Sequence, residues 1–180
     1  MRLVIGISGV IYGVRLLEAL KPLPVETHLV MTRTALVTLA HETNLKVAAV
    51  RKLADVVHGV DDLAAAVSSG SFRTMGMIVA PCSMRNLGEI ATGISSNLLT
   101  RAADVVLKER RKLVLLVRET PLHAFHLRNM ATLAEMGAII APPVPAFYNR
   151  PKTLDDVIDH IVGRVLDLFD LDTGKVKRWS

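Results

Sequence analysis

Short apolar runs alternate with stretches of helical spacing along most of the chain. The first run, Leu3 to Ile7, stops at Ser8-Gly9, and residues 11–20 follow with apolar side chains every three or four positions. This order of strand and then helix recurs to the end of the chain. We expect strands at 3–7, 25–31, near 56, 75–80, 113–117 and 138–141, and helices at 11–20, 32–41, 86–92, 97–110, 123–136 and 154–169.

Threonine and proline set several of the expected boundaries. Thr32 is placed to cap the helix that follows the second strand. Pro81 is expected to stop the strand 75–80, because proline has no N–H to donate. In residues 46–68 we expect two short helices around the small strand near Val56. The prolines within 141–152 indicate a stiff loop before the last helix.

The alternation predicts one domain of the α/β class over residues 1–180. Strands that alternate with helices form a doubly wound parallel sheet with helices on both faces, which makes three layers, α/β/α. A chain of 180 residues is long enough to bury one sizeable core.

Composition excludes several classes of protein. With 51% hydrophobic and 22% charged residues, the chain is not disordered. Its apolar runs are shorter than the ~18 residues of a membrane-spanning helix, and its first residues lack a signal-peptide pattern, so we expect a cytoplasmic location.

The net charge of +5 comes from basic residues that are dispersed among acidic ones, and it favours a small anionic ligand over nucleic acid. The single cysteine and six scattered histidines indicate neither a disulfide framework nor a metal site.

Small polar residues follow two of the strands, where an open parallel sheet binds its ligands. Ser8-Gly9 precedes the first helix, whose N-terminal N–H groups could hold a phosphate, although a tight turn would also need a glycine here. The segment from Ser83 to Asn86 offers hydroxyl and N–H groups to a phosphate or a flavin ring. Cys82 could be a nucleophile, but no histidine is near it in sequence, so a small buried residue is the favoured interpretation.

Two charged segments are further candidates. Arg118-Glu119 directly follows the strand 113–117 and suits a phosphate clamp with a proton donor, with a surface ion pair as the alternative. Lys108 shares a helix face with Arg101 and Asp104. This cluster is either a solvated helix end or the source of a cation for a ligand anion.

Several motifs together resemble one family over essentially the whole chain. The matching segments are Gly6–Gly9 with Tyr12-Gly13, Glu26–Met31, Ser68–Phe72, Pro81–Met84, Arg101–Val105, Leu107–Arg111, Arg118–Leu122, Pro142–Tyr148 and Arg164–Asp167. In these motifs the chain resembles the UbiX/Pad family of flavin prenyltransferases.

The resemblance implies a fold, a reaction and partners. The fold is a flavodoxin-like or Rossmann-like subunit, commonly assembled as a homododecamer. The reaction transfers a dimethylallyl group from dimethylallyl monophosphate to N5 and C6 of reduced FMN. The prenylated FMN is then supplied to a UbiD-type decarboxylase.

The resemblance also assigns roles to residues. The FMN-binding positions of the family fall on Ser8, Gly9, Thr32, Ser83, Met84, Arg85, Asn86 and Arg118. Its prenyl-phosphate positions fall on Lys108, Arg118, Glu119, Tyr148 and Arg164, and Trp179 matches an aromatic residue near the substrate. Lys108, Arg118 and Arg164 would stabilise the departing phosphate without a metal. Glu119 would exchange a proton with that phosphate, and Ser8 with Glu42 would form a proton relay for ring closure.

The first loop departs from the family pattern, Gly-x-[Ser/Thr]-Gly-Ala-Ser-Gly-x-x-Tyr-Gly. The segment Gly6–Gly13 is about three residues shorter. We align Ser8 with the second, catalytic serine, because this keeps Ser-Gly-x-x-Tyr-Gly intact. The short loop leaves a second hypothesis open, an FMN carrier or chaperone subunit of an aromatic-acid decarboxylase system without transferase activity. A flavin-dependent decarboxylase of cysteine peptides is disfavoured, because no histidine follows the loop after the first strand.

Overall fold

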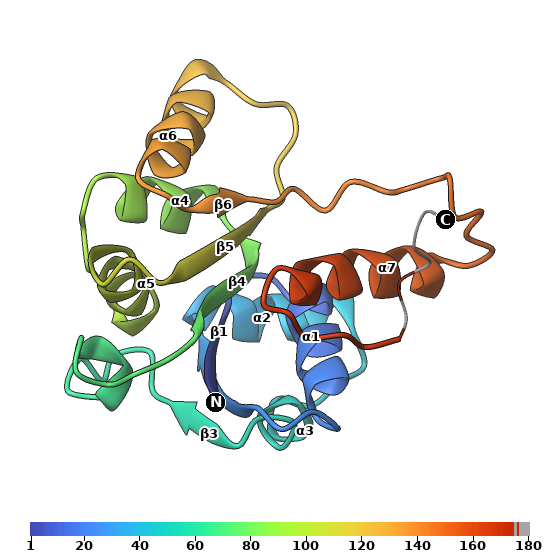
Figure 1. Cartoon of the computed structure of the whole chain (residues 1–180), viewed down its shortest axis with the longest axis horizontal. Coiled ribbons are helices and arrows are strands. Elements are labelled where there is room, and N and C mark those ends of the chain that lie inside the picture. Colours follow the sequence, from blue (N-terminus) through green and yellow to red (C-terminus); the bar gives the residue numbers. More distant parts are fainter. Residues whose placement is uncertain (175, 177–180) are drawn as a thin grey trace.

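The computed structural model describes residues 1–174 and 176, and its centre is a six-stranded parallel sheet (Figure 1). Along the sheet the strands lie in the order β3-β2-β1-β4-β5-β6. Their bounds are β1 (Arg2–Ile7), β2 (Glu26–Met31), β3 (Val56–His58), β4 (Gly76–Cys82), β5 (Lys112–Val117) and β6 (Ile139–Ile140). Every neighbouring pair is parallel. The predicted α/β class with a doubly wound parallel sheet is confirmed, and the strand order is that of the Rossmann fold.

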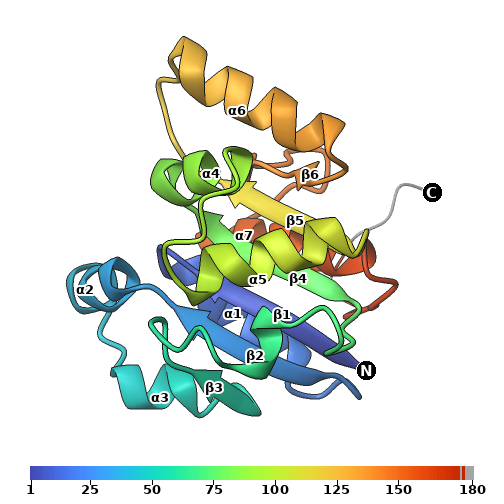
Figure 2. The same ribbon diagram turned by 90° about the vertical axis from the view of Figure 1, so that its left-hand side faces the viewer.

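Helices cover both faces of the sheet, as Figure 2 shows from the side. The helices are α1 (Ile11–Leu20), α2 (Arg33–Glu42), α3 (Val47–Arg51), α4 (Met84–Ala91), α5 (Leu98–Lys108), α6 (Ala124–Glu135) and α7 (Leu154–Asp167), with a 3-10 turn at Ala66–Ser68. None of the helices in the described part of the chain is long and apolar enough to cross a membrane.

Each central strand supplies side chains to two apolar cores, because alternate residues of a strand point to opposite faces. Along β4, Ile78 contributes to the core beneath α1 and α7, while Met77 and Val79 contribute to the core beneath α4 and α5. All three side chains are fully buried. The continuous apolar runs of the sequence therefore reflect burial on both faces.

Pro81 does not end β4, contrary to the sequence prediction. The strand continues through Pro81 to Cys82, which pairs with Val117 of β5 after a shift of register beyond Val79. This irregular step lets the strand pass a residue that has no N–H for the ladder. The carbonyl of Pro81 is thereby brought to the end of β1, where it accepts a hydrogen bond from the N–H of Ser8.

Two segments are largely exposed in the single chain. Helix α6 buries only Leu133, and the chain between β6 and α7 is an extended proline-rich arm, residues 141–152 (Figure 1). Helix α6 with the residues that flank it, and the arm, expose large apolar side chains: Leu122, Phe125, Leu127, Met136, Val144 and Phe147. Apolar groups gathered in this way typically mark a surface that another molecule covers.

Gly13 sets how closely α1 approaches the sheet. A Cβ atom at this position would lie 2.6 Å from the carbonyl oxygen of Ala80 and would also contact the side chain of Ile7. We expect Gly13→Ala to destabilise the fold by about 1–3 kcal/mol, because a backbone carbonyl cannot move aside. The thermal unfolding midpoint should fall by several degrees. Gly88→Ala is the matched control, since its Cβ would meet its nearest atom at 3.6 Å and alanine favours a helix interior. An unchanged midpoint for Gly13→Ala would contradict the close approach.

Cys82 is fully buried, and this burial raises the pKa of its thiol to about 12. At pH 8 only about one thiol in ten thousand would be ionised, and the thiolate is the reactive form. We expect the native protein to resist a thiol reagent such as dithiobis(nitrobenzoate) at pH 8 for hours. The same sample in guanidinium chloride should release one equivalent per chain at once. Rapid labelling of the native protein would restore Cys82 as a candidate nucleophile.

Candidate functional site

The site lies at the carboxyl ends of β1 and β4, where the strand order of the sheet reverses. Ser8 follows β1, and its Oγ donates a hydrogen bond of 2.8 Å to the carbonyl oxygen of Pro81. The same Oγ accepts a hydrogen bond of 2.9 Å from the backbone N–H of Ser83. Gly9 is buried directly against the Pro81 ring, where no Cβ would fit. The short first loop is therefore packed tightly onto the end of β4.

A cavity of about 430 Å³ opens beside this contact. The cavity is large enough for a ligand of the size of a nucleotide. Its walls include five of the residues that were expected to bind FMN, namely Ser8, Thr32, Ser83, Arg85 and Asn86. The strand-end rule and the family resemblance thus selected side chains that the fold brings together.

Three helices begin at the wall of this cavity. Thr32 caps α2 by accepting from the N–H of Ala35 at 3.1 Å, and Ser83 caps α4 by accepting from the N–H of Asn86 at 3.4 Å. Asn97 caps α5 by accepting from the N–H of Leu99 at 2.9 Å. Helix N-termini carry partial positive charge and free N–H groups, so three of them around one cavity favour an anionic ligand such as a phosphate ester.

Asn86 carries a polar group that has no hydrogen-bond partner in the described part of the chain. The residue is 3% exposed and lines the cavity, and its Nδ2 makes no hydrogen bond within residues 1–174 and 176. A buried amide donor is costly to leave unpaired. This nitrogen is closed off from the cavity as well, so only a turn of the side chain would bring it to a ligand. The volume of the cavity and the three helix N-termini at its wall are the features that fit FMN.

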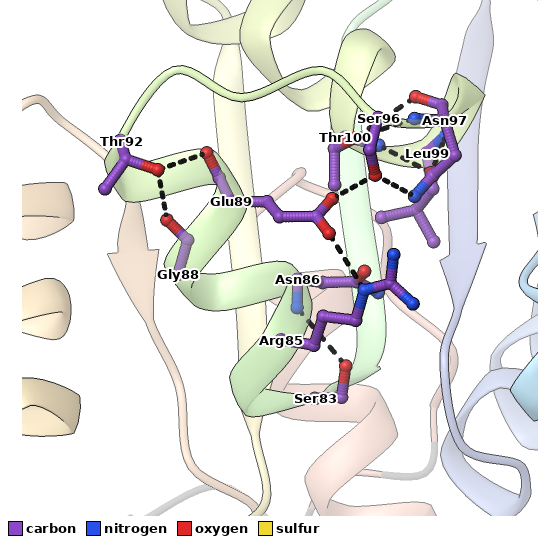
Figure 3. Close-up of polar contacts among 10 residues, drawn as sticks. All are labelled: Ser83, Arg85, Asn86, Gly88, Glu89, Thr92, Ser96, Asn97, Leu99 and Thr100. Atoms are coloured by element: carbon purple, nitrogen blue, oxygen red, sulfur yellow. Dashed lines mark hydrogen bonds and ion pairs between the residues drawn. The ribbon is translucent and has the colours of Figure 1, made fainter.

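Glu89 joins Arg85 and Ser96, two residues of the cavity wall, and Figure 3 shows these contacts. Its carboxylate accepts hydrogen bonds from Nε of Arg85 at 2.9 Å and from Oγ of Ser96 at 2.6 Å. Burial opposes ionisation of Glu89, but the hydrogen bonds from Ser96 and Arg85 outweigh it and hold its pKa below the usual range. The ionised carboxylate ties α4 to the start of α5 and fixes the direction of Arg85.

Sequence reasoning missed Glu89, Ser96 and Asn97, as well as the exposed Arg33–Asp61 ion pair of 2.7 Å at the cavity mouth. Glu89, Ser96 and Asn97 do not follow a strand, so the strand-end rule passes over them. Arg33 and Asp61 do lie just beyond the ends of β2 and β3. A signal was available for Asn97, since Asn97 and Thr100 form a capping box at the start of an apolar helix.

Arg118 and Glu119 lie at the end of β5, beside a second and smaller cavity of about 90 Å³. Ser8, Ser83 and Met84 line the same cavity, so it adjoins the first. Both charged side chains are exposed. Burial raises the pKa of Tyr12, and the positive charge of Arg118 partly opposes this shift.

Tyr148 and Arg164 line a different pocket of about 340 Å³, between the proline-rich arm and α7. Its walls are mainly apolar, with Pro142, Val144 and Val165 among them. The Tyr148 hydroxyl lies 3.1 Å from Nε2 of His160, and Arg164 donates to Asp167 at 2.8 Å. An apolar pocket with one hydroxyl and one cation suits a short hydrocarbon that carries an anionic group.

Lys108 and Glu42 lie away from these cavities within one chain. Lys108 ends α5 shortly before β5 begins, whereas Arg118 follows the end of β5. The length of this strand, about 20 Å, therefore lies between the two residues. The Nζ of Lys108 pairs with Glu109 at 2.5 Å. Glu42 ends α2, about 15 Å along the helix from the Thr32 cap. One chain therefore does not gather Lys108, Arg118 and Arg164 on one anion, nor does it join Ser8 to Glu42. Trp179 lies outside the described residues.

Comparison with known proteins gives consistent results. The sequence matches the Flavoprotein family over residues 2–166. It is 58% identical over 185 residues to the flavin prenyltransferase UbiX of Escherichia coli strain K12, with 99% of this chain and 98% of the relative covered. It is 56% identical over 184 residues to a probable UbiX-like flavin prenyltransferase of a Streptomyces species (strain D7), with 100% and 92% covered.

Solved structures agree with the sequence matches. The crystal structure of AnUbiX (PadA1) in complex with FMN and dimethylallyl pyrophosphate has a TM-score of 0.97 and 53% identity, with 99% of this chain and 97% of that chain covered. A dodecameric FMN-dependent UbiX-like decarboxylase from Escherichia coli O157:H7 also has a TM-score of 0.97, with 52% identity and full coverage of both chains. The peptidyl-cysteine decarboxylase EpiD shares only the fold, at a TM-score of 0.64 and 16% identity. The cavity at the reversal of strand order fits a flavin phosphate, and the matches cover the full length of the chain. The protein therefore belongs to the UbiX family of flavin prenyltransferases.

Proposed function

We propose that this chain transfers a dimethylallyl group from dimethylallyl monophosphate to reduced FMN. The carbon–oxygen bond of the donor breaks, phosphate leaves, and new bonds form first at flavin N5 and then at C6, where a proton is lost. The supporting observation is the cavity that joins Ser8, Thr32, Ser83, Arg85 and Asn86 to three helix N-termini. AnUbiX, at a TM-score of 0.97, binds FMN together with a dimethylallyl ester of pyrophosphate.

FMN binding would use the groups that line the larger cavity. The N-termini of α2, α4 and α5 offer N–H donors to the FMN phosphate. The amide of Asn86, once turned toward the cavity, would donate to the ring system, and Arg85, held by Glu89, would complement negative charge at the mouth. These residues bind and orient the acceptor, while the reduced ring supplies the nucleophilic nitrogen.

Cleavage of the donor requires stabilisation of a departing phosphate. Arg118, Lys108 and Arg164 would supply positive charge, and Tyr148 would donate a hydrogen bond. Glu119, beside Arg118, would exchange a proton with the phosphate. Within one chain these residues occupy three separate places. We therefore propose that a complete site forms only where copies of the chain meet.

A homo-oligomer, with twelve copies as in the Escherichia coli O157:H7 relative, would supply such contacts. The exposed apolar residues of α6 and of the arm support this proposal, because Phe125 is 67% and Phe147 is 76% exposed in the single chain. An obligate interface is rich in apolar residues of this kind. The same assembly would have to bring Glu42 of a neighbouring copy to Ser8 for the proposed proton relay, with Trp179 near the substrate.

We further propose that the product leaves for a UbiD-type decarboxylase and that the protein acts in the cytoplasm. A modified flavin made on one protein is useful only to an enzyme that binds it as a cofactor. The resemblance to UbiX supports this recipient.

Anaerobic incubation with reduced FMN and dimethylallyl monophosphate tests the transfer. We expect mass spectrometry to show FMN that has gained one five-carbon unit, together with release of inorganic phosphate. A parallel arm with the pyrophosphate ester decides which donor is used. Normal FMN binding without a prenylated mass in either arm would favour the carrier hypothesis, which the short first loop raised.

Lys108→Ala tests the role of the cation from α5. We expect kcat to fall by roughly 100-fold or more, while FMN affinity changes by less than about threefold, because the cation acts on the departing phosphate. Equal losses in both would indicate a structural role.

If Lys108 and Arg164 act from different copies, co-assembly of Lys108→Ala with Arg164→Ala should restore activity at about a quarter of the sites. Co-assembly of Lys108→Ala with Lys108→Met should restore none.

A further inference from the structure

Arg111 ties the loop of residues 69–72 to the end of α5. Its guanidinium donates to the carbonyl oxygen of Gly70 at 2.6 Å and to that of Phe72 at 2.7 Å. Only 16% of the Arg111 side chain is exposed. A planar fork that binds two carbonyls of one loop leaves that loop little freedom to shift. The loop belongs to the motif Ser68–Phe72, to which the proposed function assigns no role.

The ring of Phe72 anchors the other end of the loop. It meets the buried ring of His28 edge to face, with centroids 5.1 Å apart, and the guanidinium of Arg2 lies 4.7 Å from its centroid. The N–H of Phe72 also donates to the carbonyl oxygen of Ser69 at 3.2 Å. These contacts do not involve the fork, so its removal releases the loop at Gly70 and leaves the anchor at Phe72.

The backbone at Gly70 lies directly against the ion pair of Lys108 and Glu109. A Cβ atom added to Gly70 would collide with the carboxylate of Glu109 and would lie 2.9 Å from Nζ of Lys108. Nζ donates to Oε1 of Glu109 at 2.5 Å. This hydrogen bond and the charge of Lys108 hold the pKa of Glu109 below its usual range, so the carboxylate is ionised at neutral pH. The loop therefore forms a wall beside a charged pair.

Lys108 needs such support, because its ammonium group sits on a flexible four-carbon stem. Its side chain is 48% exposed. A cation that stabilises a departing phosphate is most effective when its position is fixed before the reaction. An ammonium group has three N–H donors, so the pair with Glu109 uses only part of its capacity.

We propose that Arg111 is a positioning residue for the transfer: by holding the loop of residues 69–72 in place, it fixes the ammonium group of Lys108. The inference rests on the proposed function, because it takes Lys108 as the cation that acts on the departing phosphate. The backbone of Arg111 is itself fixed, since its N–H donates to the carbonyl oxygen of Val106 at 2.9 Å across the end of α5. The fork therefore reaches the loop from a rigid base.

The first test replaces Arg111 by methionine in the full-length protein, which removes both donors and keeps an unbranched side chain. With reduced FMN and dimethylallyl monophosphate we expect kcat to fall about tenfold, while FMN affinity changes by less than about threefold. Arg111→Lys keeps the charge without the fork, should lose at least threefold, and carries the same comparisons if the methionine variant does not fold. Arg110→Met, at the exposed neighbouring arginine, is the matched control and should behave like the wild type.

Gly70→Ala disturbs the same ion pair from the opposite side. The new Cβ would meet the flexible ends of Glu109 and Lys108 rather than backbone atoms, so the pair must move while the fold is kept. We expect an unchanged unfolding midpoint together with a fall in kcat of about tenfold. Gly88→Ala, whose Cβ would meet its nearest atom at 3.6 Å, is the matched control and should leave kcat unchanged.

A double-mutant cycle shows whether these substitutions act through Lys108. In a Lys108→Ala background, Arg111→Met and Gly70→Ala should each lower kcat by no more than about twofold. The inference is overturned if Arg111→Met or Gly70→Ala turns over like the wild type, or if FMN affinity falls as much as kcat. It is also overturned if the losses are as large without Lys108 as with it.

A crystal structure of Arg111→Met separates this inference from the proposed function. We expect Gly70 to be displaced and the contact between Lys108 and Glu109 to be lost. A loop and an ion pair that stay as in the wild type would overturn the inference whatever the activity. If the wild type forms no prenylated flavin, the proposed transfer fails, while a displaced loop and lysine would still assign Arg111 its positioning role.

Discussion

The hydroxyl of Ser8 holds together the two strands on which the site depends. By donating to the carbonyl of Pro81 and accepting from the N–H of Ser83, it links the end of β1 to the end of β4 at the reversal of strand order. The contact fixes where α4 begins and keeps the first loop close to the sheet. A single side chain thus shapes the cavity floor and is also a candidate for the chemistry, so loss of Ser8 would remove structure and reactivity together.

Electrostatics at the cavity comes from the backbone as much as from charged side chains. Three helices begin at its wall, each with a capping residue that leaves further N–H groups available. These dipoles are fixed by the fold and need no rearrangement when an anion arrives. The ionised Glu89 gives the same rigidity to Arg85. The larger cavity therefore has the properties of a preformed phosphate site, whereas Arg118 and Glu119 beside it are exposed side chains.

Much of this arrangement could be predicted from the sequence, because local rules govern it. Apolar runs separated by helical spacing specify a parallel sheet, and the strand-end rule then selects Ser8 and the segment from Ser83 to Asn86. The passage of β4 through Pro81 could not be predicted, since it depends on a register shift against β5. The separation of Lys108 from Arg164 could not be predicted from the sequence either, because a family motif names residues without saying which copy of the chain supplies them.

The exposed side of α6 and the proline-rich arm also bear on how the protein is made. A newly folded single chain presents Phe125, Leu127 and Phe147 to water. Such surfaces adhere to one another without specificity when chains are crowded and their proper neighbours are scarce. Rapid overproduction would therefore favour precipitation over orderly association, whereas slow synthesis at reduced temperature would give each chain time to find its neighbours.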